Sequence, residues 1–295
     1  MGQFVVLSDL HIHNYKQFNQ DNKRLFNCLD VLDDAFEEAN KRGSHILFPG
    51  DLFDQQKALP TIVITSTLDR FRYLFTKYPN VLFVAISGNH DHASKNTIDK
   101  PAITALQHLA DSFPLKFMLI DNKKVTQDTT SIYGIPYYEY PSEYHKALEE
   151  LCNEAKQVAG TRILMIHQTP DGISNTNFAF DTDPSNELYS LFDFVLCGHI
   201  HQHQLLKNNF LVVGSPIHRD LGDEGQENGL VILDTNNIES YEFISLNSKY
   251  PTFTMVESDE DIPDNTYAIV KQKQLDQDDS QDIDGTKFST NLKSA

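Results

Sequence analysis

Short apolar runs alternate with amphipathic segments along the first part of the chain. Runs rich in Val, Leu, Ile and Phe at residues 3–8, 45–48 and 81–86 have the composition of buried β-strands. Between them, residues 22–41 and 61–77 carry apolar side chains at three- and four-residue spacing, which predicts amphipathic helices. The repeated order of strand, polar loop and helix predicts an α/β fold.

The rest of the chain is less regular, but both patterns continue. Apolar periodicity predicts helices over residues 102–110 and 143–158. Further strands are predicted at residues 116–120, 131–135, 162–166, 192–196, 210–213, 230–233 and 241–244. We therefore expect one large domain over residues 1–250.

The sequence changes character near residue 250. Short strands are predicted at residues 252–256 and 266–270, and we expect a small capping or partner-binding segment over residues 251–275, with a frayed tail as the alternative. Residues 276–295 are acidic and almost without apolar side chains, which predicts a disordered tail.

Five of the predicted strands are followed directly by side chains that commonly bind metal ions. In chain order the motifs are Asp9-Leu10-His11, Gly50-Asp51-Leu52-Phe53-Asp54, Gly88-Asn89-His90-Asp91, His167 and Gly198-His199-Ile200-His201. Ligands of open α/β sheets bind beyond the carboxyl ends of the strands, so we expect these loops to converge. Each motif alone could cap a turn, but all five in order make a coincidence improbable. Carboxylate, imidazole and amide ligands without thiolate suit Mn²⁺, Fe²⁺ or Zn²⁺.

Cysteine usage and the N-terminus indicate a cytoplasmic protein. Cys28, Cys152 and Cys197 are far apart and form no Cys-x-x-Cys pair, which argues against a disulfide framework and against a thiolate zinc site. The N-terminus has no basic region and reaches Asp9 too early for a signal peptide. Because no apolar run approaches the length of a membrane span, we expect no membrane association.

The net charge of −18 limits how the protein can bind nucleic acid. Residues 257–284 hold ten acidic side chains and two lysines, and the remainder of the chain is still acidic. A protein that binds DNA through its own electrostatics usually has a basic face. An acidic chain can still act on phosphate esters when bound divalent cations supply positive charge locally.

Together the five motifs resemble those of the calcineurin-like metallophosphoesterases, over roughly residues 4–245. The resemblance implies a double β-sheet sandwich flanked by helices, in four layers (α/β/β/α), with a dinuclear metal site at one edge. It assigns one metal ion to Asp9, His11 and His201, the other to Asn89, His167 and His199, and a bridging position to Asp51. Two divalent ions, with Mn²⁺ favoured over Fe²⁺ or Zn²⁺, would activate a water molecule and bind the phosphate oxygens.

The resemblance also implies three residues that assist the reaction. His90 would face the scissile phosphate and protonate the leaving oxygen. Asp54 and Asp91 would orient imidazoles or backbone amides around the metal ligands. For Asp54, a carboxylate that caps the turn after Phe53 is an equal alternative.

Within the superfamily, the chain looks like the SbcD-type exonuclease subunits of DNA double-strand-break repair. The segments that carry this likeness are the Asp51 motif, Gly214-Ser215-Pro216, residues 228–234 and residues 249–253. Asp54 stands where archaeal and eukaryotic relatives have His, so the chain is more like bacterial and phage members. The likeness implies a metal-dependent DNA exo/endonuclease subunit in DNA repair or recombination, with an SMC-like ATPase (SbcC-type) as partner.

A homodimer is also expected, through helices in the N-terminal half. The predicted helix at residues 61–78 is a candidate interface, and complete burial of this helix in the core is the alternative. A stand-alone phosphatase or a small-molecule or nucleotide phosphodiesterase is the second functional hypothesis, favoured by the acidic charge and the short C-terminal part. A binding protein with an inactive site is the third, and it is disfavoured because no metal ligand is missing.

Overall fold

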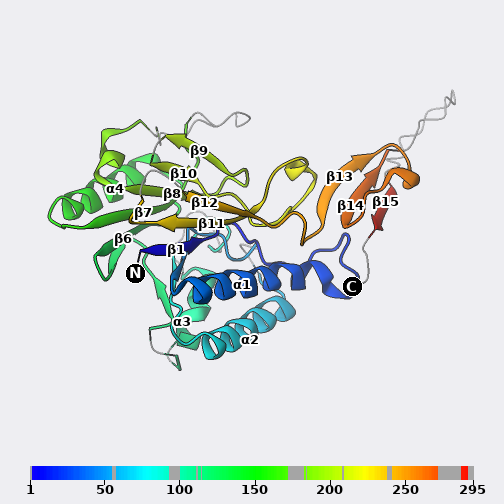
Figure 1. Ribbon diagram of the computed structural model, residues 1–295, viewed down its shortest axis with the longest axis horizontal. Helices are drawn as coiled ribbons and strands as arrows, with labels where there is room; N and C mark the ends of the chain where they lie inside the picture. The colour runs from blue at the N-terminus through cyan, green and yellow to red at the C-terminus, as the bar shows by residue number, and fades with distance from the viewer. Residues whose placement is uncertain are drawn as a thin grey trace.

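Two six-stranded β-sheets stack face to face at the centre of the molecule (Figure 1). The computed structural model describes residues 2–54, 58–92, 100–110, 112–113, 115–171, 183, 185–207, 209–237, 241–271 and 287–291. The first sheet has the order β12 (Tyr241–Ser245), β11 (Gly229–Asp234), β1 (Gln3–Val6), β2 (His45–Phe48), β3 (Phe83–Ala85) and β4 (Phe117–Leu119). The second has the order β5 (Lys123–Gln127), β6 (Thr130–Ile135), β7 (Thr161–His167), β8 (Phe194–Gly198), β10 (Phe210–Val212) and β9 (Gln204–Lys207).

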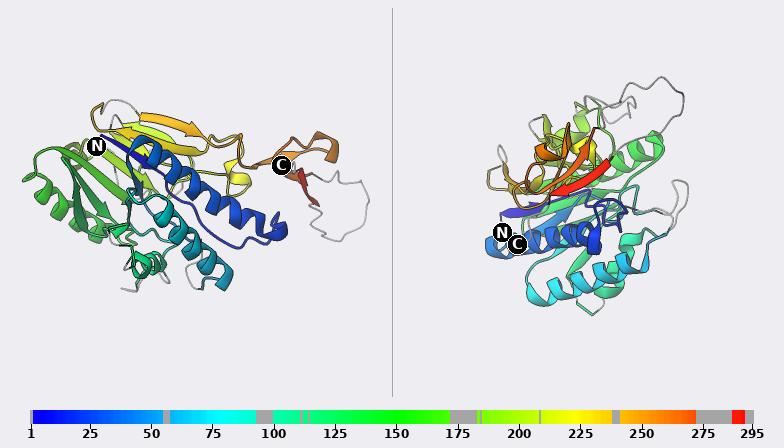
Figure 2. Two further views of the ribbon diagram at one scale, coloured as in Figure 1. Left: turned by 60° about the horizontal axis from the view of Figure 1, so that its bottom comes forward. Right: turned by 90° about the vertical axis from the view of Figure 1, so that its right-hand side faces the viewer.

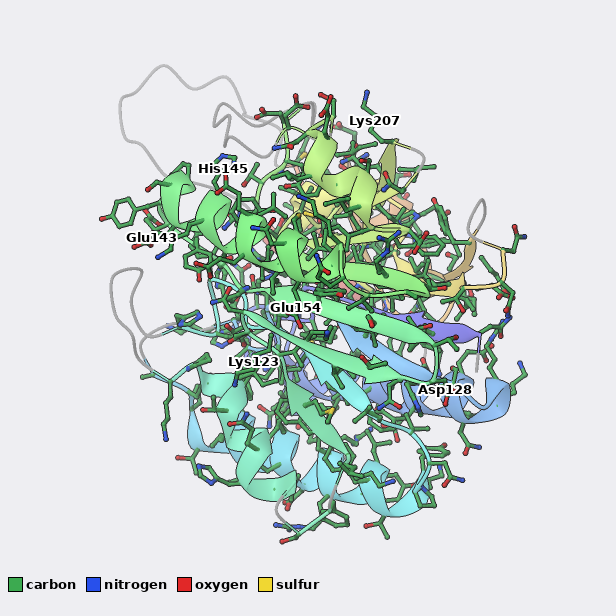
Figure 3. The ribbon with its side chains drawn as sticks, turned by 90° about the vertical axis from the view of Figure 1, so that its left-hand side faces the viewer. Lys123, Asp128, Glu143, His145, Glu154 and Lys207 are labelled. Carbon is green, nitrogen blue, oxygen red and sulfur yellow. The ribbon has the colours of Figure 1, made fainter. Side chains whose placement is uncertain are left out.

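Helices cover the outer face of each sheet. α1 (Lys23–Arg42), α2 (Thr61–Lys77) and the short α3 (Ala105–Ala110) lie on the first sheet, and α4 (Pro141–Ala155) lies on the second. Figure 2 shows the two helical layers on opposite sides of the sheets, and Figure 3 shows α4 across the outer strands. The layers therefore run α/β/β/α, and the predicted fold class is confirmed.

Alternation along the strands separates the cores of this sandwich. In β1, Phe4 and Val6 pack between the two sheets, whereas Val5 packs beneath the helices of the first sheet. Ile163 and Met165 of β7 face the same inter-sheet layer, and Leu164 packs under α4. Strands buried on both faces explain why the sequence shows continuous apolar runs. The parallel pairs β1·β2, β2·β3, β6·β7 and β7·β8 bring the carboxyl ends of these strands to one edge.

Two strands of the second sheet were not predicted. β5 and β9 form its two edges, and each pairs with a single antiparallel neighbour. Their sequences, Lys-Lys-Val-Thr-Gln and Gln-Leu-Leu-Lys, contain charged residues. All their side chains are exposed or partly exposed. Lysine in an edge strand opposes pairing with the strands of other chains. Because such a strand is polar, it cannot be recognised as an apolar run in the sequence.

A small three-stranded sheet follows the sandwich and projects beyond the start of α1 (Figure 1). β13 (Thr252–Val256) and β14 (Thr266–Val270) pair in parallel, and β14 pairs antiparallel with β15 (Lys287–Asn291). The rings of Phe253 and Tyr267 contact the ring of Phe18, which joins this sheet to the body. β15 falls within the stretch expected to be a disordered tail, and the rest of residues 276–295 lies outside the described residues.

Helix α2 packs one face into the core. Phe71 and Phe75 are buried against Phe36 of α1, whereas Tyr73 is 51% exposed. A homodimer through this helix therefore stays a prediction, and only its outer face could supply the contact. Within the described residues, no helix combines the length and hydropathy needed to cross a membrane.

Candidate metal centre

All the predicted site residues lie in the described part of the chain and gather at one edge of the sandwich. Asp9 and His11 follow β1, Asp51 and Asp54 follow β2, and Asn89, His90 and Asp91 follow β3. His167 is the last residue of β7, and His199 and His201 come directly after β8. Three potential metal-binding groups form among them: Asp9, His11 and His201; Asp51, His167 and His199; and His11, Asp54 and His90.

Backbone strain and close packing hold these loops in place. Asp9, His11, Asp51 and His199 all have positive φ values, of 53°, 47°, 59° and 82°. Such conformations cost about 1–3 kcal/mol each for residues other than glycine and persist where surrounding contacts enforce them. Here the loop after β1 bonds to the loop after β2: the N–H of Asp9 donates to the Gly50 carbonyl (3.1 Å) and that of His11 to the Asp51 carbonyl (3.1 Å).

The first group of ligands centres on two facing imidazoles. Nε2 of His11 lies 3.1 Å from Nε2 of His201, and Oδ1 of Asp9 lies 3.9 Å from the same His11 atom. Burial, with the nearby charges of His11 and Arg219 acting in the same direction, lowers the pKa of His201 to about 2. His201 is therefore neutral at ordinary pH and offers a lone pair, as a metal ligand must.

In the second group, several nitrogen and oxygen atoms that can accept a proton or a metal ion lie close together. Nδ1 of His167 lies 2.8 Å from the Pro49 carbonyl, so this nitrogen carries the proton and donates it, which leaves Nε2 as the ligand atom. That Nε2 lies 3.0 Å from Oδ1 of Asn89 and 3.3 Å from Oδ2 of Asp51. Oδ1 of Asn89 is also 2.9 Å from Nδ1 of His199. A proton or a metal ion must sit among these acceptors to offset their repulsion.

The titration of the second group reflects the same demand for positive charge. Burial lowers the pKa of His167, but the Asp51 carboxylate outweighs it and raises this pKa to about 9. Burial lowers the pKa of His199 to about 3, with the His167 charge acting in the same direction. The His167 imidazole is thus protonated and pairs with the Asp51 carboxylate, while the His199 imidazole is neutral and can act as a ligand.

Asp51 lies between the two groups. Its Oδ2 is 3.6 Å from Nε2 of His11 and 3.3 Å from Nε2 of His167. Its Oδ1 accepts the backbone N–H of His90 (2.8 Å), which fixes the orientation of the carboxylate. Burial raises the pKa of Asp51, but the charges of His167 and His11 outweigh it and hold this pKa below its usual range. A carboxylate in this position can bind a metal ion on each side.

The donor set fits two divalent cations. Asp9, Asp51 and Asp91 are at most 2% exposed and lie within one small volume, and burial raises the pKa of Asp9 to about 6. Buried carboxylates at this density need nearby positive charge, which imidazolium or metal ions can supply. The thiol of Cys197 donates to the Gln168 carbonyl and burial raises its pKa, so the candidate ligands are oxygen and imidazole nitrogen atoms.

His90 and Asp54 occupy the mouth of the centre. The His90 ring meets His11 edge to face, with ring centroids 4.8 Å apart, and its Nδ1 lies 2.7 Å from the Asp54 carbonyl. Since a carbonyl oxygen can only accept, this contact makes Nδ1 the donor. The carboxylate of Asp54 lies 3.4 Å from Nδ1 of His11, a position compatible with the histidine-orienting role, and both this role and the turn cap stay predictions.

Asp91 organises the backbone and does not contact a histidine ring in the described structure. Its carboxylate accepts the N–H groups of Gly88 (3.0 Å), Asp51 (3.0 Å) and Phe53 (3.2 Å). It therefore joins the loop after β2 to the loop after β3, which carry the bridging carboxylate and the Asn89 ligand. These are the contacts that a role in orienting backbone amides requires, and the role in the reaction stays a prediction.

Two residues near the centre were not found from the sequence. Nη1 of Arg219 lies 3.3 Å from Nε2 of His11 and 3.5 Å from Nε2 of His201. The ring of Tyr137 packs against His199, with ring centroids 5.8 Å apart. The only sequence signal for Arg219 is its place five residues after Gly214, in a segment already noted for its likeness to nucleases.

Two further histidines near the motifs, His203 and His218, have structural roles. His218 is 5% exposed, and its Nδ1 accepts the backbone N–H of Phe253 (3.1 Å). The His203 ring stacks on Phe243 and bonds to the Val213 carbonyl (3.0 Å). Both roles depend on strands of the C-terminal part that pack over these loops, which local sequence does not reveal.

The chain is similar to known proteins in sequence and in fold. A family model described as calcineurin-like phosphoesterase matches residues 2–203, which include every predicted metal ligand. The structure is similar to TT1561 of Thermus thermophilus, with 16% identity, 83% of this chain and 99% of that chain covered, and a TM-score of 0.47. It is also similar to the Pseudomonas putida nuclease MPE, with 14% identity, 79% and 85% covered, and a TM-score of 0.32. No curated protein matches the sequence.

Proposed function

The chain belongs to the calcineurin-like phosphoesterase family, and we propose that within this family it is a DNA nuclease subunit that hydrolyses phosphodiester bonds. Membership implies a metal-dependent hydrolase. The observation that carries the proposal is the position of Asp51, whose carboxylate lies between two groups of ligands with His90 directly beside it.

The chain's own residues would bind two divalent ions, with Mn²⁺ as the favoured metal. Asp9, His11 and His201 would hold one ion, Asn89, His167 and His199 the other, and Asp51 both. When bound, the ions supply the positive charge that binds phosphate oxygens and lowers the pKa of water. The neutral state of His199 and His201 keeps their lone pairs available for this task.

His90 would supply the proton for the leaving oxygen. Its Nδ1 is occupied by the Asp54 carbonyl, so the ring is fixed and Nε2 is the atom that can face a substrate. The side chain is 29% exposed, which gives a phosphate at the centre access to it. General acid catalysis of this kind contributes about 10²–10⁴-fold to the rate.

Two features of the C-terminal part support a nuclease. The segments that carry the nuclease likeness meet in space, because the Asn228 side chain donates to both the carbonyl (2.9 Å) and the hydroxyl (2.8 Å) of Ser215. The small sheet of β13, β14 and β15 packs beside the centre. The backbone N–H of Phe253 in β13 donates to His218, which lies next to Arg219 in the loop at the centre. A module in this position could contact DNA that enters the site.

The charge of the protein supports a partner. A net charge of −18 opposes tight binding of DNA by this chain alone, because DNA affinity comes mainly from basic side chains. We propose that an SMC-like ATPase supplies most of the DNA affinity, and that the chain acts as a homodimer. The same acidity favours the second candidate, a small-molecule or nucleotide phosphodiesterase.

The test is hydrolysis of an end-labelled linear DNA duplex in Mn²⁺. The purified protein should release nucleotides, and His90→Ala should lower the rate by about 10²–10⁴-fold with its metal content unchanged. His108→Ala is the matched control, since His108 is an exposed residue of α3. If the protein hydrolyses a small phosphodiester such as bis(p-nitrophenyl) phosphate in a His90-dependent way and leaves DNA intact, even with an added ATPase subunit, the second candidate is correct.

A further inference from the structure

We infer that Arg219 is the phosphate-binding residue of the centre, contacting the non-bridging oxygens of the phosphodiester that the metal ions hold. The inference rests on the proposed hydrolysis of phosphodiesters, but not on DNA as the substrate. It is carried by the position of the guanidinium, by the way its loop is held, and by the distance of the nearby carboxylates from its N–H groups.

The guanidinium lies at the mouth of the first ligand group. Its Nη1 is 3.3 Å from Nε2 of His11 and 3.5 Å from Nε2 of His201, and the side chain is 29% exposed. Guanidinium and divalent cations repel each other at such short range, so a third, negative group is needed between them in the metal-loaded site. A phosphate meets this need, since its oxygens can bind the metals on one side and a forked pair of N–H groups on the other.

The loop holds Arg219 by its backbone and leaves its side chain for another task. Its N–H donates to Oδ2 of Asp223 (2.6 Å), and its carbonyl accepts from Nη2 of Arg24 (2.5 Å). The Arg24 guanidinium is itself buried, 3.7 Å above the Tyr15 ring, and also bonds to the Gln17 carbonyl (3.2 Å). One arginine therefore supports the loop, and the other is presented to the centre.

Nearby carboxylates do not account for the Arg219 side chain. Asp220 and Asp54 are 3.6 Å and 3.9 Å away from its nearest nitrogen atoms, which exceeds hydrogen-bond distance. Asp220 is also 62% exposed, and an exposed ion pair contributes little to stability. Removing the side chain should therefore leave the fold and the loop intact.

The experiment compares Arg219→Ala and Arg219→Lys with the unchanged protein loaded with Mn²⁺. Hydrolysis of bis(p-nitrophenyl) phosphate gives kcat and KM, inorganic phosphate binding is measured by calorimetry, and metal content is measured by mass spectrometry. Arg219→Ala should weaken phosphate binding and raise KM by about ten- to a hundredfold, the loss expected for a charge-assisted contact, with two metal ions retained. Arg219→Lys keeps the charge without the fork and should fall between the two.

Arg72→Ala is the control, because Arg72 is a 60% exposed arginine paired only with Asp69 at 3.0 Å within the described structure. Unchanged phosphate affinity and KM in Arg219→Ala would overturn the inference. Loss of metal from this variant would also overturn it, by showing that Arg219 supports the ligands. If the unchanged protein cleaves the small diester but not DNA, the nuclease proposal fails alone. If it cleaves neither, the phosphate calorimetry still decides the role of Arg219.

Discussion

Asp54 is a residue that can support a candidate metal ligand, His11, without binding the metal itself. Its carboxylate lies 3.4 Å from Nδ1 of His11, the ring nitrogen opposite to the one that faces the metal group. Burial raises the pKa of Asp54, but the contact with His11 and the charge of Arg219 outweigh it and hold this pKa below its usual value. Asp54 thus stays ionised beside His11, and we expect it to orient the ring so that Nε2 faces the metal-binding group.

This role predicts the effect of Asp54→Asn. Loss of the charge next to His11 should lower Mn²⁺ affinity or activity by about 10- to 100-fold, as for other partners of metal-binding histidines. Calorimetric titration with Mn²⁺ measures the affinity. Asp69→Asn is the control, because Asp69 is 72% exposed on α2. If Asp54→Asn binds Mn²⁺ normally and is only less stable, Asp54 is a turn cap, the alternative left open by the sequence.

At the scale of elements, glycines with positive φ end helix α1 and the turn after strand β2. Gly50 ends the turn after β2 with a φ of 97°, and a Cβ atom there would come within 2.4 Å of Nδ1 of His167. Gly43 ends α1 with a φ of 61°, but a Cβ atom there would meet nothing within 4 Å. The two positions share a left-handed backbone and differ in what surrounds them.

The pair predicts unequal costs for the same substitution. Gly43→Ala should lower the free energy of unfolding by about 1–2 kcal/mol, the cost of a left-handed conformation alone. Gly50→Ala should cost about 3 kcal/mol or more, because the added methyl group displaces His167, and should also impair metal binding. Urea denaturation and Mn²⁺ titration measure both effects. Equal losses of stability with normal metal binding would show that the contact between Gly50 and His167 is not needed.

The elements also show how far the sequence can predict this molecule. Buried strands such as β1 and β7 are recognisable as apolar runs. Each candidate metal ligand lies at or shortly after the end of such a strand, so the candidates could be predicted from strand ends. Arg219 could not, because a long side chain reaches the centre from a loop whose shape depends on Arg24 and Asp223. Those contacts join residues that are far apart in sequence, and no local pattern records them.

For the whole molecule, metal binding should be a large contribution to stability. The centre concentrates carboxylates and imidazoles where the first sheet, the second sheet and the C-terminal loops meet, so their repulsion acts on every layer. A ligand that binds only the folded state stabilises it by about 2.7 kcal/mol at a concentration one hundred times its dissociation constant. Two such ions would stabilise the fold by about twice that amount.

Thermal unfolding with and without metal checks this expectation. Protein treated with a chelator should unfold several degrees below protein in excess Mn²⁺, by an amount that grows with Mn²⁺ concentration. In Asp51→Asn the stabilisation by Mn²⁺ should be largely lost, since this carboxylate faces both ligand groups. A melting temperature that does not respond to Mn²⁺ would mean that the folded centre does not bind it at these concentrations.

The central claim is that one carboxylate joins two metal sites, and anomalous X-ray diffraction from crystals grown with Mn²⁺ tests it most directly. We predict two anomalous peaks about 3.5–4 Å apart. One should contact Asp9, His11 and His201, the other Asn89, His167 and His199, with Asp51 between them. A single peak, or two peaks that do not share Asp51, would contradict the account.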